Sequence, residues 1–298
     1  MSVEIRPIDN HSFAREVIGA QLWNELAPAD IDAVHAAWAD SGILVFRRQA
    51  LSEAELSRFS SLFGKPEVIH RTDWVSREYP EVAFLSNLRD NDGNTIGRTG
   101  TDDLEWHTDQ SYVMNPATGA VLYGVEIPND GGGSTWWANM RLAYEALPAA
   151  LKKAIEGKRA IFDYNKRLAG YDKGSQNVTE EMRRQTPPIT HAIVNTHPVT
   201  GSKILYLDPG TTTGIEGMPE KEGQELLQAL LEVATQPQFV YRHRWQVGDV
   251  IMWDNGMMLH RRDSFQSRQR RFHKRTTLAL SPLRHVVPKG RLYIEATV

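Results

Sequence analysis

The spacing of apolar residues predicts a helix, a strand and a second helix near the start of the chain. Apolar side chains recur on one stripe of Pro28–Ser41, which predicts a helix. The short apolar run Ile43–Phe46 suits a buried strand. Ser52 and Glu55 have the spacing of a capping box, and Gly64 ends the helix that they open. We therefore expect a helical N-terminal part, about residues 1–64, that packs on the rest of the protein.

After Val82 the pattern changes to short apolar runs that are separated by turn residues. Five runs are predicted to be strands: residues 121–127, 203–207, 239–245, 250–253 and 276–280. Two helical patterns lie among them, at residues 141–157 and 220–234. Many strands with a few helices predict a mostly β fold, a sandwich or jelly roll with helical cover.

The organisation of the chain indicates one domain over residues 1–298. No linker, repeat or low-complexity stretch divides the sequence. Residues 163–188 form a poorly patterned stretch that is too long for a simple turn. We interpret this stretch as a lid or insert that covers a binding site.

Composition excludes several classes of function. The chain has no cysteine, which excludes disulfides, thiolate metal sites and cysteine nucleophiles. Its net charge is −3, so an excess of cations for binding nucleic acid is lacking. No apolar run approaches the roughly 18 residues of a membrane span, and residues 1–8 lack a signal-peptide core. These features predict a cytoplasmic protein with neither a nucleic acid nor a membrane as its partner.

A histidine and an aspartate stand one residue apart in Trp106-His107-Thr108-Asp109. On an extended chain their side chains point to the same face, so both can reach one ion. An isolated pair of this kind is more often a hydrogen-bonded surface pair, and the motif therefore needs context.

His260 provides that context, directly after the predicted strand 250–253 and 153 residues beyond His107 (260 − 107). Two histidines and one carboxylate can form a facial triad that leaves coordination positions open. These ligands suit Fe(II). A buried core histidine is the alternative interpretation for His260 taken alone.

Two arginines follow in the segment that leads into the strand 276–280. Arg271 and Arg275 are four residues apart and thus share one face of an extended chain. A buried guanidinium needs an anion, and its planar fork matches a carboxylate. The glycine loop 130–134 ends at Thr135, whose hydroxyl could contact the same anion.

Together these motifs resemble the TauD/TfdA family of taurine and aryloxyalkanoate dioxygenases. The resemblance extends from about Gly42 to about Leu280 and includes Gly42 to Arg47, the His-x-Asp pair and the Gly-Gly-Ser-Thr loop. It continues through Tyr241 to Asp249, Trp253 to Asn255 and His260. It implies a double-stranded β-helix, a distorted, cupin-like jelly roll, and a homodimer or homotetramer.

The resemblance also implies roles for individual residues. His107, Asp109 and His260 match the iron ligands, and Arg271 with Thr135 matches the groups that bind the distal carboxylate of 2-oxoglutarate. Trp253 matches a tryptophan near this cosubstrate. Two positions match groups that bind the primary substrate: His70 and Arg275.

The implied activity is Fe(II)- and 2-oxoglutarate-dependent hydroxylation of a small anion by O2, with release of succinate and CO2. A metal-dependent hydrolase with the same ligands is disfavoured because no His-Glu-x-x-His element is present. A halogenase is disfavoured because Asp109 occupies the position that chloride would need. The alternative from another class is a non-catalytic jelly-roll protein that binds or senses 2-oxoglutarate.

Overall fold

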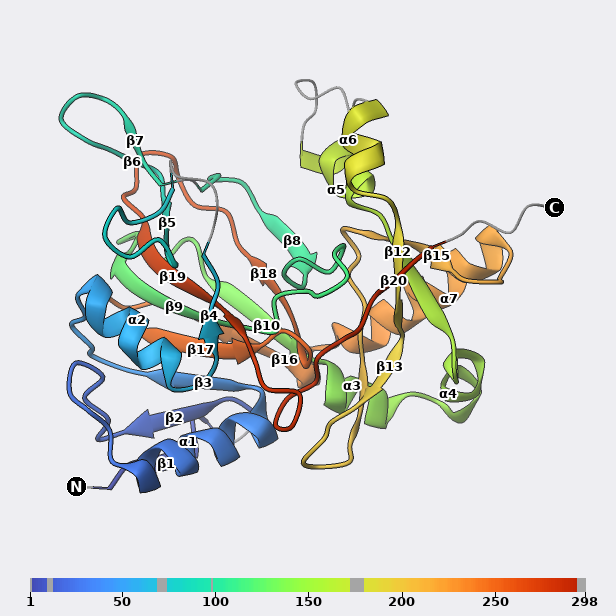
Figure 1. Ribbon diagram of the computed structural model, residues 1–298, viewed down its shortest axis with the longest axis horizontal. Helices are drawn as coiled ribbons and strands as arrows, with labels where there is room; N and C mark the ends of the chain where they lie inside the picture. Colours follow the sequence, from blue (N-terminus) through green and yellow to red (C-terminus); the bar gives the residue numbers. More distant parts are fainter. Residues whose placement is uncertain (1, 10–12, 69–73, 98, 172–179, 294–298) are drawn as a thin grey trace.

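The computed structural model describes the chain except residues 1, 10–12, 69–73, 98, 172–179 and 294–298. Strands predominate, and helices flank the sheets (Figure 1). The described helices are α1 (Pro28–Ser41), α2 (Glu53–Ser61), α3 (Met140–Ala146), α4 (Ala149–Ile155), α5 (Tyr164–Tyr171), α6 (Glu180–Gln185) and α7 (Glu220–Ala234). The predicted mostly β architecture with flanking helices is confirmed. None of the helices described is both long and apolar enough to cross a bilayer.

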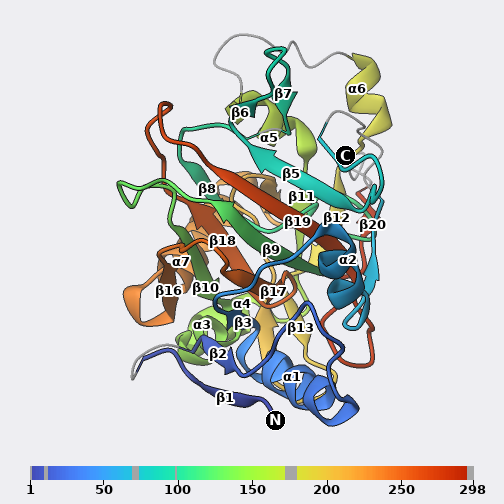
Figure 2. The same ribbon diagram turned by 90° about the vertical axis from the view of Figure 1, so that its left-hand side faces the viewer.

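The largest sheet has eight strands and joins the two ends of the sequence. Its order is β1 (Glu4–Pro7), β2 (Arg15–Ile18), β3 (Ile43–Phe46), β17 (Val250–Asp254), β9 (Gly119–Glu126), β19 (Phe272–Ala279) and β4 (Lys65–Pro66), and β5 (Val82–Ser86) also pairs with β19. Figure 2 shows β5, β19 and β9 running side by side. Strand β3 thereby pairs with β17, a strand from the far end of the chain.

Alternate side chains of β3 enter two different cores. Leu44 and Phe46 pack in the core beneath α1 and α2, and Ile43 and Val45 pack in the core on the opposite face of the sheet. Successive side chains of a strand point to opposite faces, which explains why the whole run Ile43–Phe46 is apolar and buried. Each such side chain stabilises the fold by about 1.5–3 kcal/mol relative to an exposed one.

Two four-stranded sheets and two short strand pairs complete the described fold. One sheet has the order β16 (Val240–His243), β10 (Thr135–Asn139), β18 (Met258–Arg262) and β8 (Leu104–His107). The other has the order β15 (Thr212–Ile215), β11 (Arg159–Phe162), β12 (Ile189–Ala192) and β20 (Arg291–Leu292). The short pairs are β6 (Leu88–Arg89) with β7 (Thr95–Ile96) and β13 (Val194–Thr196) with β14 (Lys203–Leu205).

The helix predicted over residues 141–157 is interrupted, so the prediction of one continuous helix was wrong. Leu147 has ψ 137°, an extended conformation, and the chain restarts as α4 with Pro148 as its N-cap. The proline ring disfavours helical backbone in the residue before it and removes a backbone donor. The predicted strand 239–245 is also shorter, since Pro237–Phe239 forms a 3-10 turn and β16 ends at His243.

The N-terminal part, residues 1–64, contains two strands in addition to the predicted helix, strand and helix. It also contributes β1 and β2 to the large sheet. The four residues of β1 are mostly exposed, so no apolar alternation marks them in the sequence. The stretch 163–188 contains α5 and α6 rather than irregular chain alone, and residues 172–179 within it are not described.

Candidate functional site

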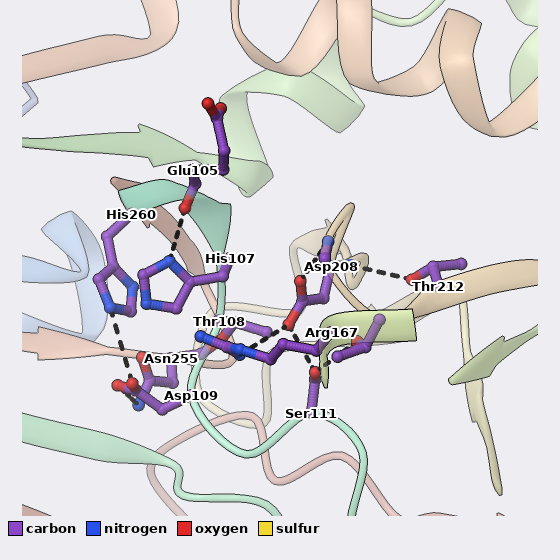
Figure 3. Close-up of polar contacts among 12 residues, drawn as sticks. Glu105, His107, Thr108, Asp109, Ser111, Arg167, Asp208, Thr212, Asn255 and His260 are labelled. Carbon is purple, nitrogen blue, oxygen red and sulfur yellow. Dashed lines mark hydrogen bonds and ion pairs between the residues drawn. The ribbon is translucent and has the colours of Figure 1, made fainter. Parts of the chain in front are cut away.

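The structure brings His107, Asp109 and His260 together. His107 ends β8 and lies opposite His260, the central residue of β18, with 4.1 Å between the ring centroids. Asp109 follows two residues after His107, and its Oδ1 lies 3.7 Å from Nε2 of His260. One ligand atom from each residue lies within 4.8 Å of the other two (Figure 3). This spacing allows all three to bind one ion.

Both histidine rings are in the neutral form, which can coordinate a metal ion. Nδ1 of His107 lies 2.7 Å from the backbone carbonyl oxygen of Glu105. A carbonyl only accepts, so the neutral ring carries its proton on Nδ1 and leaves the Nε2 lone pair available. Burial, together with nearby cations, lowers the pKa of His107 to about 3 and that of His260 to about 4. Both rings are therefore neutral at pH 7, the form that coordinates a metal.

The two oxygens of Asp109 have different neighbours. Oδ1 faces His260, whereas Oδ2 accepts hydrogen bonds from Arg275 at 2.6 Å and from Asn255 at 3.0 Å. Burial opposes ionisation of Asp109, but Arg275 and the two histidines hold its pKa well below the ordinary value. A carboxylate held in this way keeps one oxygen directed at the metal position, and the donor set of two imidazoles and one carboxylate fits Fe(II).

Trp253 and Asn255 support this arrangement from β17 and the turn after it. The indole Nε1 of Trp253 donates to Asn255 Oδ1 at 2.7 Å, which leaves the amide nitrogen to donate to Asp109. The Trp253 ring lies 5.1 Å from the ring of His260, and the guanidinium of Arg275 lies 5.5 Å from the Trp253 ring. Asn255 was not predicted as a site residue, although its place directly after the buried strand β17 was a usable signal.

Arg271 is buried and has no contact with the three candidate metal ligands among those described. Arg271 is 3% exposed. Among the described residues, its guanidinium has no ion pair and its Nε has no hydrogen-bond partner. A Cβ added to Gly133, which has φ +70°, would lie 3.3 Å from this Nε, so the glycine loop borders the guanidinium closely. Burial and the neighbouring Arg262 lower the pKa of Arg271 to about 9. A buried cation without an anion is costly, and the Arg271 guanidinium therefore fits a carboxylate ligand.

Thr135 begins β10, directly after the glycine loop. Its Oγ1 accepts a hydrogen bond from the indole Nε1 of Trp245 at 2.9 Å. The hydroxyl proton of Thr135 is thereby left to donate to another acceptor. The remaining predicted substrate-binding residue, His70, lies outside the described residues.

Arg167 and Asp208 form a polar group that was not predicted from the sequence. Asp208 is fully buried and accepts hydrogen bonds from Ser111 Oγ at 2.5 Å and from the Gly210 backbone at 2.8 Å. Nη1 of Arg167 lies 3.9 Å from Asp208 Oδ2. Figure 3 shows the Arg167 side chain extending from α5 toward the side on which His107 and Asp109 lie. The one indication in the sequence was that Arg167 lies in residues 163–188, the stretch predicted to be a lid.

The sequence profile of the family described as "Taurine catabolism dioxygenase TauD, TfdA family" matches residues 4–277. The chain belongs to this family. The alpha-ketoglutarate-dependent 2,4-dichlorophenoxyacetate dioxygenase of Cupriavidus pinatubonensis is 35% identical over 287 residues, which cover 93% of this chain and 98% of that protein. The alkylsulfatase of Acinetobacter baylyi is 32% identical over 275 residues, which cover 89% of this chain and 81% of that protein.

Solved structures agree with this assignment to the TauD/TfdA family. The crystal structure of AAD-2 in complex with Mn(II) and N-oxalylglycine has a TM-score of 0.79 and 30% sequence identity to this TauD/TfdA protein. The match covers 94% of this chain and 98% of AAD-2. The chain is an enzyme, a dioxygenase that depends on iron and 2-oxoglutarate.

Proposed function

We propose that this dioxygenase hydroxylates a C–H bond of a small organic anion, using O2 and releasing succinate and CO2 from 2-oxoglutarate. The observation that carries the proposal is the convergence of His107, Asp109 and His260. It is accompanied by the burial of Arg271 without a described anion. Three ligands that leave coordination positions open and a buried cation fit an iron ion and the distal carboxylate of 2-oxoglutarate. When bound, this pair supplies the oxidation of the C–H bond.

The residues of the chain bind and orient these groups. His107, Asp109 and His260 would hold the iron, and Asn255 and Arg275 fix the orientation of the aspartate. Arg271 would hold the distal carboxylate of 2-oxoglutarate, and Thr135 would donate its hydroxyl proton to the same group. Trp253 would shield the cosubstrate from water beside His260.

Two guanidinium groups support an anionic primary substrate. Arg275 has a buried Nε without a partner among the described residues, even though its Nη2 contacts Asp109. Arg167 contributes a second positive charge, which lowers the pKa of both His107 and His260. The relatives' names support an aryloxyalkanoate or a sulfate ester, and a sulfonate or another carboxylate fits the same cations. Hydroxylation beside an ether or ester oxygen gives a product that collapses and cleaves that bond.

The same proposal extends to the architecture. The eight-stranded sheet and the sheet formed by β16, β10, β18 and β8 share one apolar core, which supports a double-stranded β-helix with the ligands at its mouth. We propose a single domain over residues 1–298, which acts in the cytoplasm. A homodimer or homotetramer remains a prediction, which the molar mass from light scattering would test.

A succinate-release assay tests the proposal. The purified protein, Fe(II), ascorbate and 2-oxoglutarate would be incubated with phenoxyacetates, alkyl sulfates, taurine and amino acids, with His107→Ala as the inactive control. We expect at least one anion to stimulate succinate release in the wild type only. A protein that binds 2-oxoglutarate but never forms succinate would be a sensor and would contradict the proposal.

A further inference from the structure

His273 is a buried histidine that the functions assigned so far do not use. It is 0% exposed, and neither of its ring nitrogens has a hydrogen-bond partner within the described structure. It is the second residue of β19, and Arg271 directly precedes this strand; the charge of Arg271 acts on His273, so the two side chains lie near each other. A buried imidazole N–H without an acceptor costs about 1–3 kcal/mol, which indicates a missing partner.

The neighbours of His273 connect it to Thr135, the residue proposed to bind the distal carboxylate together with Arg271. Its ring packs edge-on against Trp245, with 4.6 Å between the centroids. Trp245 in turn donates to Thr135. Ser134, the residue before Thr135, also has a buried hydroxyl without a described partner. A chain of contacts from His273 through Trp245 to Thr135 therefore connects two residues, His273 and Ser134, whose buried polar atoms have no described partner.

The protonation state of His273 determines what it can offer. Burial, assisted by the charges of Arg271 and Arg262, holds the pKa of His273 well below the ordinary value for histidine. The ring is therefore neutral at pH 7 and carries one N–H donor and one acceptor nitrogen. It can therefore donate to a carboxylate without adding a third positive charge to those of Arg271 and Arg262.

We propose that His273 donates a hydrogen bond to the distal carboxylate of the cosubstrate, as a third contact beside Arg271 and Thr135. This inference rests on the proposed function, since it assumes that 2-oxoglutarate binds at Arg271. Its specific consequence is selectivity: His273 favours a 2-oxo acid that ends in a second carboxylate over one of the same length that ends in a methyl group.

Calorimetric titration of the Mn(II)-loaded protein tests this inference without turnover. Two ligands are compared, 2-oxoglutarate and 2-oxopentanoate, which has the same chain length but no distal carboxylate. The variants are His273→Phe, which removes the donor, and His273→Gln, which keeps a neutral one. His35→Phe on α1 is the matched control, because it removes an imidazole that also has an unpartnered nitrogen. His273→Met replaces His273→Phe if the latter does not fold.

We expect His273→Phe to weaken 2-oxoglutarate binding about tenfold or more, the effect of one hydrogen bond to a charged group. Its affinity for 2-oxopentanoate should stay within about twofold, and His273→Gln should retain most of the discrimination. An equal loss for both ligands, or no loss for either, would overturn the inference and leave the proposed function intact. Failure of the wild type to bind 2-oxoglutarate would instead reject the proposed function, and the inference with it.

Discussion

Arg275 donates a hydrogen bond to Asp109 Oδ2 over 2.6 Å, which links a strand of the large sheet to a candidate metal ligand. The contact leaves Asp109 Oδ1 on the side of His260. It also leaves the buried Nε of Arg275 without a described partner. Arg275 thus has capacity for a second anion after it has fixed the aspartate.

Replacement of Arg275 by alanine should raise the Michaelis constant for the anionic primary substrate at least tenfold, since a desolvated charge pair is lost. The affinity for 2-oxoglutarate should change by less than about threefold. More succinate should form without hydroxylated product, because the substrate C–H bond is no longer held in position. Paired titrations of both ligands provide the measurement. Weaker 2-oxoglutarate binding with unchanged substrate binding would assign Arg275 to the cosubstrate.

His107→Ala and His260→Ala should each abolish stoichiometric Fe(II) binding while the far-ultraviolet circular dichroism remains that of the wild type. Each change removes one of three ligands and leaves the surrounding β ladder in place. The absorption band of the anaerobic complex with Fe(II) and 2-oxoglutarate reports binding. Persistence of this band in both variants would reject the assignment of the triad.

Arg271→Ala should raise the Michaelis constant for the cosubstrate by tens-fold or more, equivalent to about 2–5 kcal/mol for a buried charge pair. Steady-state kinetics with varied 2-oxoglutarate provide the measurement, and Arg270 is the matched control. It is adjacent in sequence but exposed, and it pairs with Glu126 at 2.6 Å. A large effect of Arg270→Ala with none of Arg271→Ala would mean that the assignment is shifted by one residue.

Arg167→Met should raise the Michaelis constant for the anionic substrate about tenfold, because the second guanidinium beside the triad is lost. Arg184→Met on α6 is the control, since the Arg184 side chain is 73% exposed. Steady-state kinetics with the best substrate of the succinate screen provide the comparison. An unchanged Michaelis constant in Arg167→Met would remove this arginine from the substrate site.

Stability should fall as the pH is lowered from about 6.5 to about 4, partly because of His191. Burial lowers the pKa of His191 to about 4, so the unfolded state, with a pKa of about 6.5, binds the extra proton over this range. The free energy of unfolding should fall by up to about 1.4 kcal/mol per pH unit for this group. Urea titrations of the metal-free protein across this pH range would show a flatter dependence in His191→Gln. The same slope in both proteins would contradict the prediction.

Local patterns predicted the elements whose boundaries are set by neighbouring residues. The helix Pro28–Ser41, the strand Ile43–Phe46 and the capping box of Ser52 with Glu55 are as predicted. The break at Pro148 was missed because the apolar spacing continues across it. Strand β1 was missed because its pairing with β2, rather than its own composition, holds it in place.

Sequence patterns indicate site residues that carry a recognisable chemical group, and they miss residues whose contact partner is remote in the chain. The spacing of His107 and Asp109 indicates shared ligation only together with His260. Nothing near Asp208 in the sequence reveals Ser111, which is 97 residues away and donates to it. The sequence likewise does not show that both ring nitrogens of His273 lack hydrogen-bond partners, because this depends on how the folded chain packs around the ring.

The pairing of His107 with His260 also determines when the proposed iron site can form during synthesis. The two rings meet only when β8 and β18, which are far apart in the sequence, are hydrogen-bonded to each other. A growing chain on the ribosome cannot form this pair until His260 has left the exit tunnel, and closing so long a loop is slow. Iron held by both rings would therefore bind only after residue 260 has emerged, and its binding would report that these two distant strands have paired.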